Sequence, residues 1–220
     1  GNVIKNISDT ITNIDSSNKL TNKSRIEIIK QFSNMCISMI EGQYLDINYE
    51  NQQIISINNY KNMIIKKTGA LMTLAFQLPC MVSGQNNESI KKLQKLGIIF
   101  GILFQISDDM LGIWGNPIKT GKSNYSDLRN NKKTYPILLS MKKFKKEDKI
   151  LFNNLLSNLN KTSYLSIIEI LEKYRIKSDI QKECNSYLDE AIKLINTSKL
   201  TKDSKANIIE LFKYVIERTK

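Results

Sequence analysis

Residues 88–114 restrict the fold of this chain more than any other segment of the sequence. Apolar residues recur there at intervals of three and four, the spacing of one helical face: Leu93, Leu96, Ile99, Leu103 and Ile106. Further apolar residues occupy the other faces of the segment. A helix that is apolar over much of its surface has to be covered by other helices, so these residues predict the centre of a helical bundle.

The rest of the sequence predicts the helices that cover it. The chain has only three prolines and nine glycines in 220 residues, so few positions interrupt a helix. No stretch alternates in the manner of a half-buried strand. Amphipathic helices are predicted at residues 3–14, 22–46, 56–82 with a kink at Pro79, 135–141, 146–159, 164–174, 178–196 and 204–218. We therefore predict an all-α fold, with one helical domain over residues 1–220.

The cysteines Cys36, Cys80 and Cys184 are far apart, and the chain has no histidine. This composition excludes a zinc or haem site and a Ser-His or Cys-His nucleophile. Scattered thiols favour a reducing compartment, so we expect a cytoplasmic protein, with a plastid or another organelle as the alternative. No signal peptide is apparent, and no apolar run approaches the roughly 20 residues that span a bilayer. We therefore expect no transmembrane segment.

The formal net charge of +12 is compatible with nucleic-acid binding. However, the lysines are spread along the chain, and no block of arginines with interleaved aromatic residues occurs. We therefore expect no nucleic-acid partner, and a basic helical nucleic-acid-binding protein is the least favoured alternative. A basic surface would equally suit a small polyanion such as a diphosphate.

Gln105, Asp108, Asp109 and Gly112 are three to four residues apart, so they share one face of the predicted central helix. Adjacent aspartates in an apolar helix are costly unless something neutralises them. An exposed stripe, a salt bridge to a neighbouring helix or a helix end would each explain the pair. By itself, the pair favours one of these structural explanations over a magnesium site.

The loop that follows the aspartates changes this balance. It reads WGNPIKTGKSNYSDLRNNKKTYP and carries Lys119, Lys122, Arg129, Lys132 and Lys133. Magnesium takes one or two carboxylates and completes its shell with phosphate oxygens and water, while nearby lysines hold the remaining phosphate charge. A carboxylate pair followed by a Gly- and Lys-rich loop therefore indicates a metal–diphosphate site. The GKS tripeptide is no P-loop, because no GxxxxGK follows a strand.

Two further elements fit the same interpretation. Gly69 follows Lys66, Lys67 and Thr68 inside an apolar helix, where a glycine costs about 1 kcal/mol relative to alanine. It indicates close approach either by a ligand or by a crossing helix. Gln43 and Asp46 are three residues apart and share a helical face, although Asp46 could also be an exposed residue at a helix end.

Taken together, EGQYLDI (41–47), KKTGAL (66–71) and FQISDDMLGIWGNPIKTGKSNYSDLRNNKKTYP (104–136) resemble the trans-prenyl diphosphate synthase family. This family includes the bacterial-type farnesyl and geranylgeranyl diphosphate synthases. The resemblance extends from about residue 1 to the C-terminus. It implies a helical bundle of the isoprenoid synthase type, a Mg²⁺ cofactor and a homodimer. It also implies head-to-tail condensation of isopentenyl diphosphate with an allylic diphosphate.

The resemblance also implies roles for individual residues. Asp108 and Asp109 match the start of the second aspartate-rich motif and would hold magnesium on the allylic diphosphate. Lys67 and Lys122 would contact that diphosphate, so these four residues are the predicted catalytic set. The predicted substrate-binding set consists of Gln43, Asp46, Lys67, Thr68, Gln105, Lys122 and Lys132.

The chain departs from the family pattern at two points. Gly112 stands where many members have a third aspartate, and no DDxxD motif precedes Asp108. The resemblance therefore implies that N-terminal helices of the usual bundle are missing and that this chain alone is inactive. The alternative is a non-catalytic, synthase-like subunit that modulates a complete partner.

Overall fold

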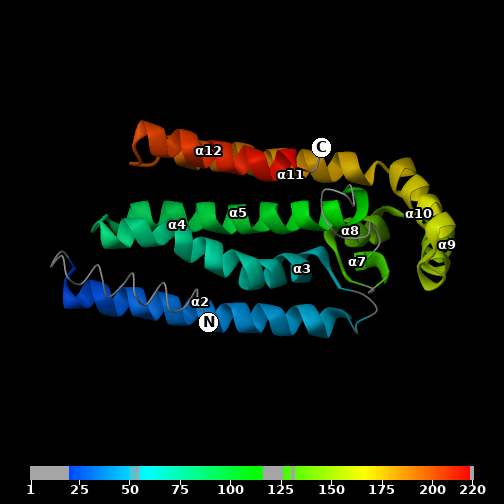
Figure 1. Cartoon of the computed structure of the whole chain (residues 1–220), viewed down its shortest axis with the longest axis horizontal. Helices are drawn as coiled ribbons and strands as arrows, with labels where there is room; N and C mark the ends of the chain where they lie inside the picture. The colour runs from blue at the N-terminus through cyan, green and yellow to red at the C-terminus, as the bar shows by residue number, and fades with distance from the viewer. Residues whose placement is uncertain (1–19, 51, 53–54, 116–125, 130–131, 219–220) are drawn as a thin grey trace.

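The computed structural model describes residues 20–50, 52, 55–115, 126–129 and 132–218, and the helix predicted at 3–14 lies outside them. No strand occurs in these ranges. Figure 1 shows the order of the helical elements: α2 (Asn22–Glu50), α3 (Ile57–Ile64), the π-helical turn η1 (Ile65–Gly69), α4 (Ala70–Val82), α5 (Asn87–Trp114), α7 (Ser126–Arg129), α8 (Tyr135–Lys143), α9 (Lys146–Ser157), α10 (Lys161–Lys173), α11 (Ile176–Asn196) and α12 (Lys202–Glu217).

The helix α5 forms the centre of the bundle, as the sequence predicted. It runs between α11 and α12 on one side and α3 and α4 on the other (Figure 1). Leu96, Leu103, Ile106 and Ile113 on this helix are completely buried. The apolar residues that repeat along 88–114 therefore form the core that holds the other helices in place.

The expectation that no apolar run reaches membrane-spanning length was wrong for α5. This helix, Asn87–Trp114, contains an 18-residue window with a mean hydropathy of 1.6, which is long and apolar enough to cross a membrane by composition. However, 67% of that window is buried inside the protein. Such burial is typical of the core helix of a bundle, which passes the same test of length and hydropathy.

The helix predicted at 56–82 is interrupted at a point that the sequence did not show. Ser56 caps its start by accepting a hydrogen bond from the Asn59 backbone N–H at 3.0 Å, as predicted. The turn η1 then widens the helix over Ile65–Gly69, and α4 continues through Pro79. π-Turns of this kind occur frequently at functional sites, because they redirect side chains within a helix.

Close backbone contacts fix the helices on either side of η1. A Cβ on Gly101 of α5 would lie 2.5 Å from the Gly69 Cα atom, so the two helices cross with their backbones in contact. A helix does cross at Gly69, but a Cβ on Gly69 itself would meet nothing closer than 3.5 Å, so the crossing requires a glycine at 101 rather than at 69. On α2, a Cβ on Gly42 would lie 2.2 Å from the Lys67 backbone nitrogen. These contacts bring the end of α2 and the middle of α5 against η1.

Helices α8 to α12 confirm the remaining predicted segments, with shifted ends. The capping box of Asn160 and Ser163 starts α10 at Lys161 rather than at residue 164. Arg175, which adopts a left-handed conformation with φ of 54°, separates α10 from α11. Figure 1 shows α9 and α10 beyond the ends of the long helices. The long helices therefore form the bundle, and α7 and α8 lie at the end of α5 that carries the acidic pair.

Candidate active site

A small cavity lies where the C-terminal part of α5 meets η1, the end of α2 and the start of α8. Its volume is about 10 Å³, which is room for about one water molecule. It is lined by Asp46, Tyr60, Met63, Lys67, Gln105, Asp109, Lys132, Lys133 and Thr134. Carboxylates and lysines from sequence-distant elements therefore share this cavity.

Asp109 is 1% exposed and is held by hydrogen bonds on both carboxylate oxygens. Its Oδ2 accepts from the Tyr60 hydroxyl at 2.6 Å and from the Tyr135 backbone N–H at 2.8 Å, and its Oδ1 accepts from Gln105 Nε2 at 3.1 Å. Burial raises the pKa of Asp109 to about 6, although these hydrogen bonds favour the charged form. Burial, followed by the charge of Asp109, also raises the pKa of Tyr60, which stays a hydrogen-bond donor.

The neighbouring Asp108 lies in a different environment. It is half-buried, and it makes no hydrogen bond or ion pair to any residue in the described ranges. The oxygens of Asp109 are already engaged by protein donors, whereas no donor from the described residues bonds to those of Asp108. The two adjacent acids, which look alike in sequence, therefore differ in burial. Asp108, the more exposed of the two, is the one suited to bind a cation directly.

Lys132 brings the positive charge of the loop to this acidic end. Burial by itself lowers the pKa of Lys132, but the carboxylates of Asp127, Asp109, Asp46 and Asp108 together raise it above its ordinary value. The amine of Lys132 therefore stays charged next to four carboxylates. The structure thus places one predicted loop lysine beside the acidic pair. The other, Lys122, lies outside the described residues.

Hydrogen bonds connect η1 to the same site. Lys67 Nζ donates to Asp46 Oδ2 at 2.5 Å, and Thr68 Oγ1 donates to Gln105 Oε1 at 3.0 Å. Gln105, which also donates to Asp109, therefore links η1 to the acidic pair. Two of the described substrate-binding residues do not line the cavity: Thr68 reaches it only through Gln105, and Gln43 is exposed on α2.

Several residues at the site gave no signal in the sequence. Tyr60 and Tyr135 look like ordinary aromatic core residues, yet both donate to Asp109. Asp127 of α7 is the third residue of this kind. Its carboxylate lies against α5, since a Cβ on Gly112 would lie only 2.4 Å from its Oδ2 atom. A carboxylate from α7 therefore occupies the space beside position 112, where many family members carry an aspartate. Asp127 belongs to the SDLR stretch of the loop, and no helical spacing relates it to the acidic pair.

Thr134 is a further residue that the sequence did not indicate. It is 1% exposed and stands at the N-cap of α8, but its side chain makes no capping hydrogen bond. Its Oγ1 atom has no hydrogen-bond partner among the described residues, and the residue lines the cavity. Because a buried hydroxyl normally has a partner, Thr134 leaves one donor and acceptor for a bound molecule.

These side chains fit magnesium together with a diphosphate. In the described part of the chain, no group of three or more His, Cys, Asp or Glu side chains could hold a metal ion by itself. Magnesium does not require such a group, since it takes one or two carboxylates and fills its shell with phosphate oxygens and water. Asp108 offers the carboxylate, Lys67 and Lys132 offer the charge for phosphate, and Thr134 offers an unpaired hydroxyl.

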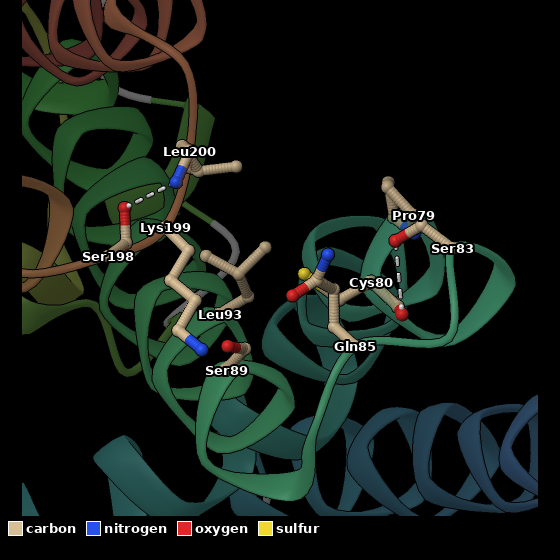
Figure 2. Close-up of a pocket in the computed structure, with 9 residues that line it drawn as sticks. All are labelled: Pro79, Cys80, Ser83, Gln85, Ser89, Leu93, Ser198, Lys199 and Leu200. Atoms are coloured by element: carbon tan, nitrogen blue, oxygen red, sulfur yellow. Dashed lines mark hydrogen bonds between the residues drawn. The ribbon is translucent and has the colours of Figure 1, made fainter.

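A larger cavity at the opposite end of α5 lacks this chemistry. It has a volume of about 130 Å³ and lies between the end of α4 and the α11–α12 connection (Figure 2). It is lined by Pro79, Cys80, Ser83, Gln85, Ser89, Leu93, Ser198, Lys199 and Leu200. No carboxylate is among these residues, and the length of α5 from Leu93 to Asp109 separates the two cavities by about 24 Å. The smaller cavity is therefore the candidate active site.

Comparison with known proteins identifies the family of the chain. Residues 6–172 match the family model for polyprenyl synthetases. The chain belongs to the polyprenyl synthetase family. This confirms the resemblance to trans-prenyl diphosphate synthases that the three motifs predicted.

Individual members of the family show how far the similarity extends. A geranylgeranyl diphosphate synthase of Saccharolobus solfataricus is 30% identical over 184 residues, which cover 82% of this chain and 55% of that protein. A geranylfarnesyl diphosphate synthase of Aeropyrum pernix is 35% identical over 124 residues, or 56% of this chain and 39% of that protein. The chain therefore spans about half the length of the curated relatives that it matches.

The fold is shared with the same family. The crystal structure of a geranylgeranyl pyrophosphate synthetase from Pyrococcus horikoshii superposes with a TM-score of 0.82 at 26% identity, over 90% of this chain and 60% of that one. A heptaprenyl diphosphate synthase from Staphylococcus aureus superposes with a TM-score of 0.75, also at 26% identity, over 88% of this chain and 60% of that one. The predicted all-α bundle of the isoprenoid synthase type is confirmed.

Proposed function

We propose that this chain carries the diphosphate-ionising site of a prenyltransferase that joins isopentenyl diphosphate head-to-tail to an allylic diphosphate. The observation that carries the proposal is the cavity in which Asp46 and Asp109 meet Lys67 and Lys132. A site that binds a diphosphate needs cations for the phosphate and a carboxylate for a metal. Lys67 and Lys132 at the cavity are the cations, and Asp108, which does not line the cavity but adjoins Asp109, is the carboxylate. Membership of the polyprenyl synthetase family supports the same reaction class.

In this proposal, Asp108 holds magnesium against the allylic diphosphate. When bound, magnesium neutralises the negative charge that develops on the leaving diphosphate. Lys132, half-buried among four carboxylates, and Lys67 on η1 hold the remaining phosphate charge. Because these charges are in place before the bond breaks, they stabilise the transition state more than the bound substrate.

The apolar surface of α5 supports the second half of the reaction. Ionisation leaves an allylic carbocation, which water would quench before isopentenyl diphosphate could attack it. Ile106 and Met110 flank the acidic pair on α5, and both are 1% exposed or less. A dry wall of this kind next to the phosphate site protects the cation until the new carbon–carbon bond forms.

We also propose that this chain alone cannot complete the metal site. The acidic pair offers one available carboxylate, and no further cluster of metal ligands occurs in the described ranges. The activity assay should therefore use the longest in-frame product of the gene that contains this chain. The chain of 220 residues should be inactive when assayed alone.

The test is condensation of labelled isopentenyl diphosphate with allylic diphosphates in the presence of Mg²⁺. We expect Asp108→Ala to lower turnover about 100-fold or more, because it removes charge stabilisation from the transition state. Asp203→Ala, at an exposed position on α12, serves as the matched control and should not change turnover. Near-normal turnover of Asp108→Ala would contradict the proposed metal role.

A non-catalytic subunit is the second candidate function. It would use the same fold to modulate a complete partner synthase, and the family match is compatible with it. The retained acid–lysine cavity speaks for catalysis, because a subunit that does not bind diphosphate has no need of buried charges. The same assay separates the two: a subunit gives no product by itself but changes the activity of an added synthase.

We further propose a second copy of this chain as a partner, bound through α2. Apolar residues on this helix are 54–70% exposed: Ile26, Ile29, Ile37, Ile40, Tyr44 and Ile47. Most of them are three or four residues apart, with one interval of eight between Ile29 and Ile37, so they form one stripe along the helix, as in helices that pair along a seam. A two-fold axis would place the same stripe on both copies, so the two stripes would cover each other.

A further inference from the structure

Tyr135 is held at both ends, and only one of these contacts belongs to the cavity. Its backbone N–H donates to Asp109 Oδ2 at 2.8 Å, and its hydroxyl donates to a carboxylate oxygen of Glu183 on α11. The side chain is buried, and its ring lies 5.5 Å from the ring of Tyr60, the other donor to Asp109 Oδ2. The position of Tyr135 is therefore set jointly by the acidic pair and by α11.

Glu183 is the centre of a second cluster, outside the cavity. Its Oε1 accepts from Lys61 Nζ at 2.7 Å, while its Oε2 accepts from Tyr135. Lys61 also donates to the Tyr187 hydroxyl at 3.0 Å, and its Nζ lies 5.8 Å from the centre of the Tyr135 ring. Lys61, Glu183 and Tyr187 do not line the cavity. Among the described contacts, this cluster reaches Asp109 through the Tyr135 hydroxyl, and through the backbone that joins Lys61 to Tyr60.

The two donors explain why a carboxylate is needed at position 183. A glutamate accepts hydrogen bonds at both oxygens, so it binds Lys61 on one and Tyr135 on the other. A glutamine has one acceptor oxygen, so it can accept from only one of the two donors. With that oxygen on Lys61, the Tyr135 hydroxyl would have to turn and accept from the neutral amide nitrogen, which exchanges a charge-assisted bond for a weaker one. Removing the negative charge would also leave Lys61, about a quarter exposed, without its ion-pair partner.

The start of α8 depends on these contacts because its own cap is weak. Thr134 occupies the N-cap position without a side-chain capping hydrogen bond. The contacts of Tyr135 therefore anchor the first turn of the helix. Lys132 lies three residues earlier, so the same anchor fixes the end of the loop that brings its amine to the carboxylates.

We propose that Glu183 is a positioning residue, which holds Asp109 and the Lys132 end of the loop in place through Tyr135. The proposal rests on the proposed function and extends it to α11, which contributes no residue to the cavity. Hydrogen-bonded partners behind a binding site orient the residues that touch the ligand, and their loss typically weakens metal binding about 10- to 100-fold. Glu183 would act in this way on a magnesium–diphosphate site.

The test compares two tyrosine variants that lose the same kind of bond. Tyr135→Phe removes the hydroxyl that reaches Glu183 but keeps the ring and the backbone N–H. The control is Tyr174→Phe, because the Tyr174 hydroxyl donates to Asp148 Oδ2 at 2.5 Å, away from the acidic pair. Hydrogen exchange measures the protection of the residue 135 amide, and calorimetry measures the affinity for inorganic pyrophosphate with Mg²⁺. Both measurements use the longest in-frame product of the gene.

We expect Tyr135→Phe to speed exchange of the residue 135 amide about tenfold and to weaken Mg²⁺–pyrophosphate binding about tenfold. Glu183→Gln should reproduce both effects. Tyr174→Phe should lower the melting temperature about as much as Tyr135→Phe does. It should leave the exchange of the residue 135 amide and the affinity for Mg²⁺–pyrophosphate unchanged. Equal effects from the two tyrosine variants, or unchanged protection of the amide in Tyr135→Phe, would overturn the proposal. Absence of pyrophosphate binding in the wild type contradicts the proposed function instead, and amide exchange then decides the positioning role alone.

Discussion

The buried carboxyl of Asp109 makes the pH dependence of folding a direct test of the site. Burial raises its pKa from 3.8 to about 6. Asparagine has nearly the same shape and cannot ionise, and its oxygen can accept from Tyr60 and Tyr135 as the carboxylate does. The nitrogen of the asparagine would face the Gln105 nitrogen, so the Gln105 amide has to turn over and present its oxygen instead. It can do so because the Thr68 hydroxyl, which now donates to the Gln105 oxygen, can equally accept from the Gln105 nitrogen. Asp109→Asn should therefore fold.

The pKa sets both the sign and the size of the effect. Between pH 3.8 and about 6 the folded state holds a proton that the unfolded state has lost, so stability falls as the pH rises. A shift of about 2 units at 1.36 kcal/mol per unit corresponds to a destabilisation of about 3 kcal/mol. The folded protein bears this cost in full above the folded-state pKa and does not bear it below the unfolded-state pKa. Asp109→Asn removes this cost. Its stability relative to the wild type should grow by about 2 kcal/mol between about pH 4.5 and 7.5.

The assay is urea denaturation followed by circular dichroism at several pH values in this range. The chain has no histidine, so no imidazole titrates in the same window. Lys132, whose pKa is raised, stays charged throughout. Asp203→Asn, at an exposed position, is the control and should show no such trend. A stability difference for Asp109→Asn that does not vary with pH would refute the reasoning, because it would mean that burial does not raise the pKa of this carboxyl.

Three further predictions concern other parts of the molecule. Gly42→Ala should lower the free energy of unfolding by about 1–3 kcal/mol in urea titrations, because the new methyl group would overlap the Lys67 backbone; Asn34→Ala on the same helix is the control. Thr134→Val should weaken Mg²⁺–pyrophosphate binding in calorimetry about fivefold or more, whereas Thr134→Ser, which keeps the hydroxyl, should not. Ile40→Glu, placing a charge in the centre of the α2 stripe, should convert a dimer to a monomer in light scattering, and an unchanged mass would exclude this interface.

Local sequence predicted the elements whose formation depends on neighbouring residues. The periodicity of residues 88–114 predicted α5 as the central helix, and Ser56 predicted the start of α3. The N-cap of α5 is Asn86, which accepts the hydrogen bond from the Ser89 N–H, although the adjacent Asn87 is the same type of residue. Helix ends depend on a single side-chain contact, so neighbouring asparagines cannot be distinguished by type alone.

The sequence also predicted much of the candidate site, since motif residues share helical faces. Asp109, Lys67 and Gln105 lie at the cavity, as the spacing and the family resemblance indicated. Gln43 shares a face with Asp46 in the sequence pattern, but the structure leaves it exposed. The packing of Gly42 against the Lys67 backbone brings only one side of α2 to η1, so residues on the same broad face differ in their access to the cavity.

By itself, the sequence determined the all-α fold, the central helix and the acidic and basic residues of the candidate site, because periodicity and motifs are local properties of the chain. Only the tertiary structure decided that Asp109 is buried and bonded, while no described residue bonds to Asp108. It also decided that Tyr60 and Tyr135, which are 49 and 26 residues away from Asp109 in sequence, are its partners. The physical reason is that desolvation and hydrogen bonding depend on which distant elements pack together, and no local pattern records that packing.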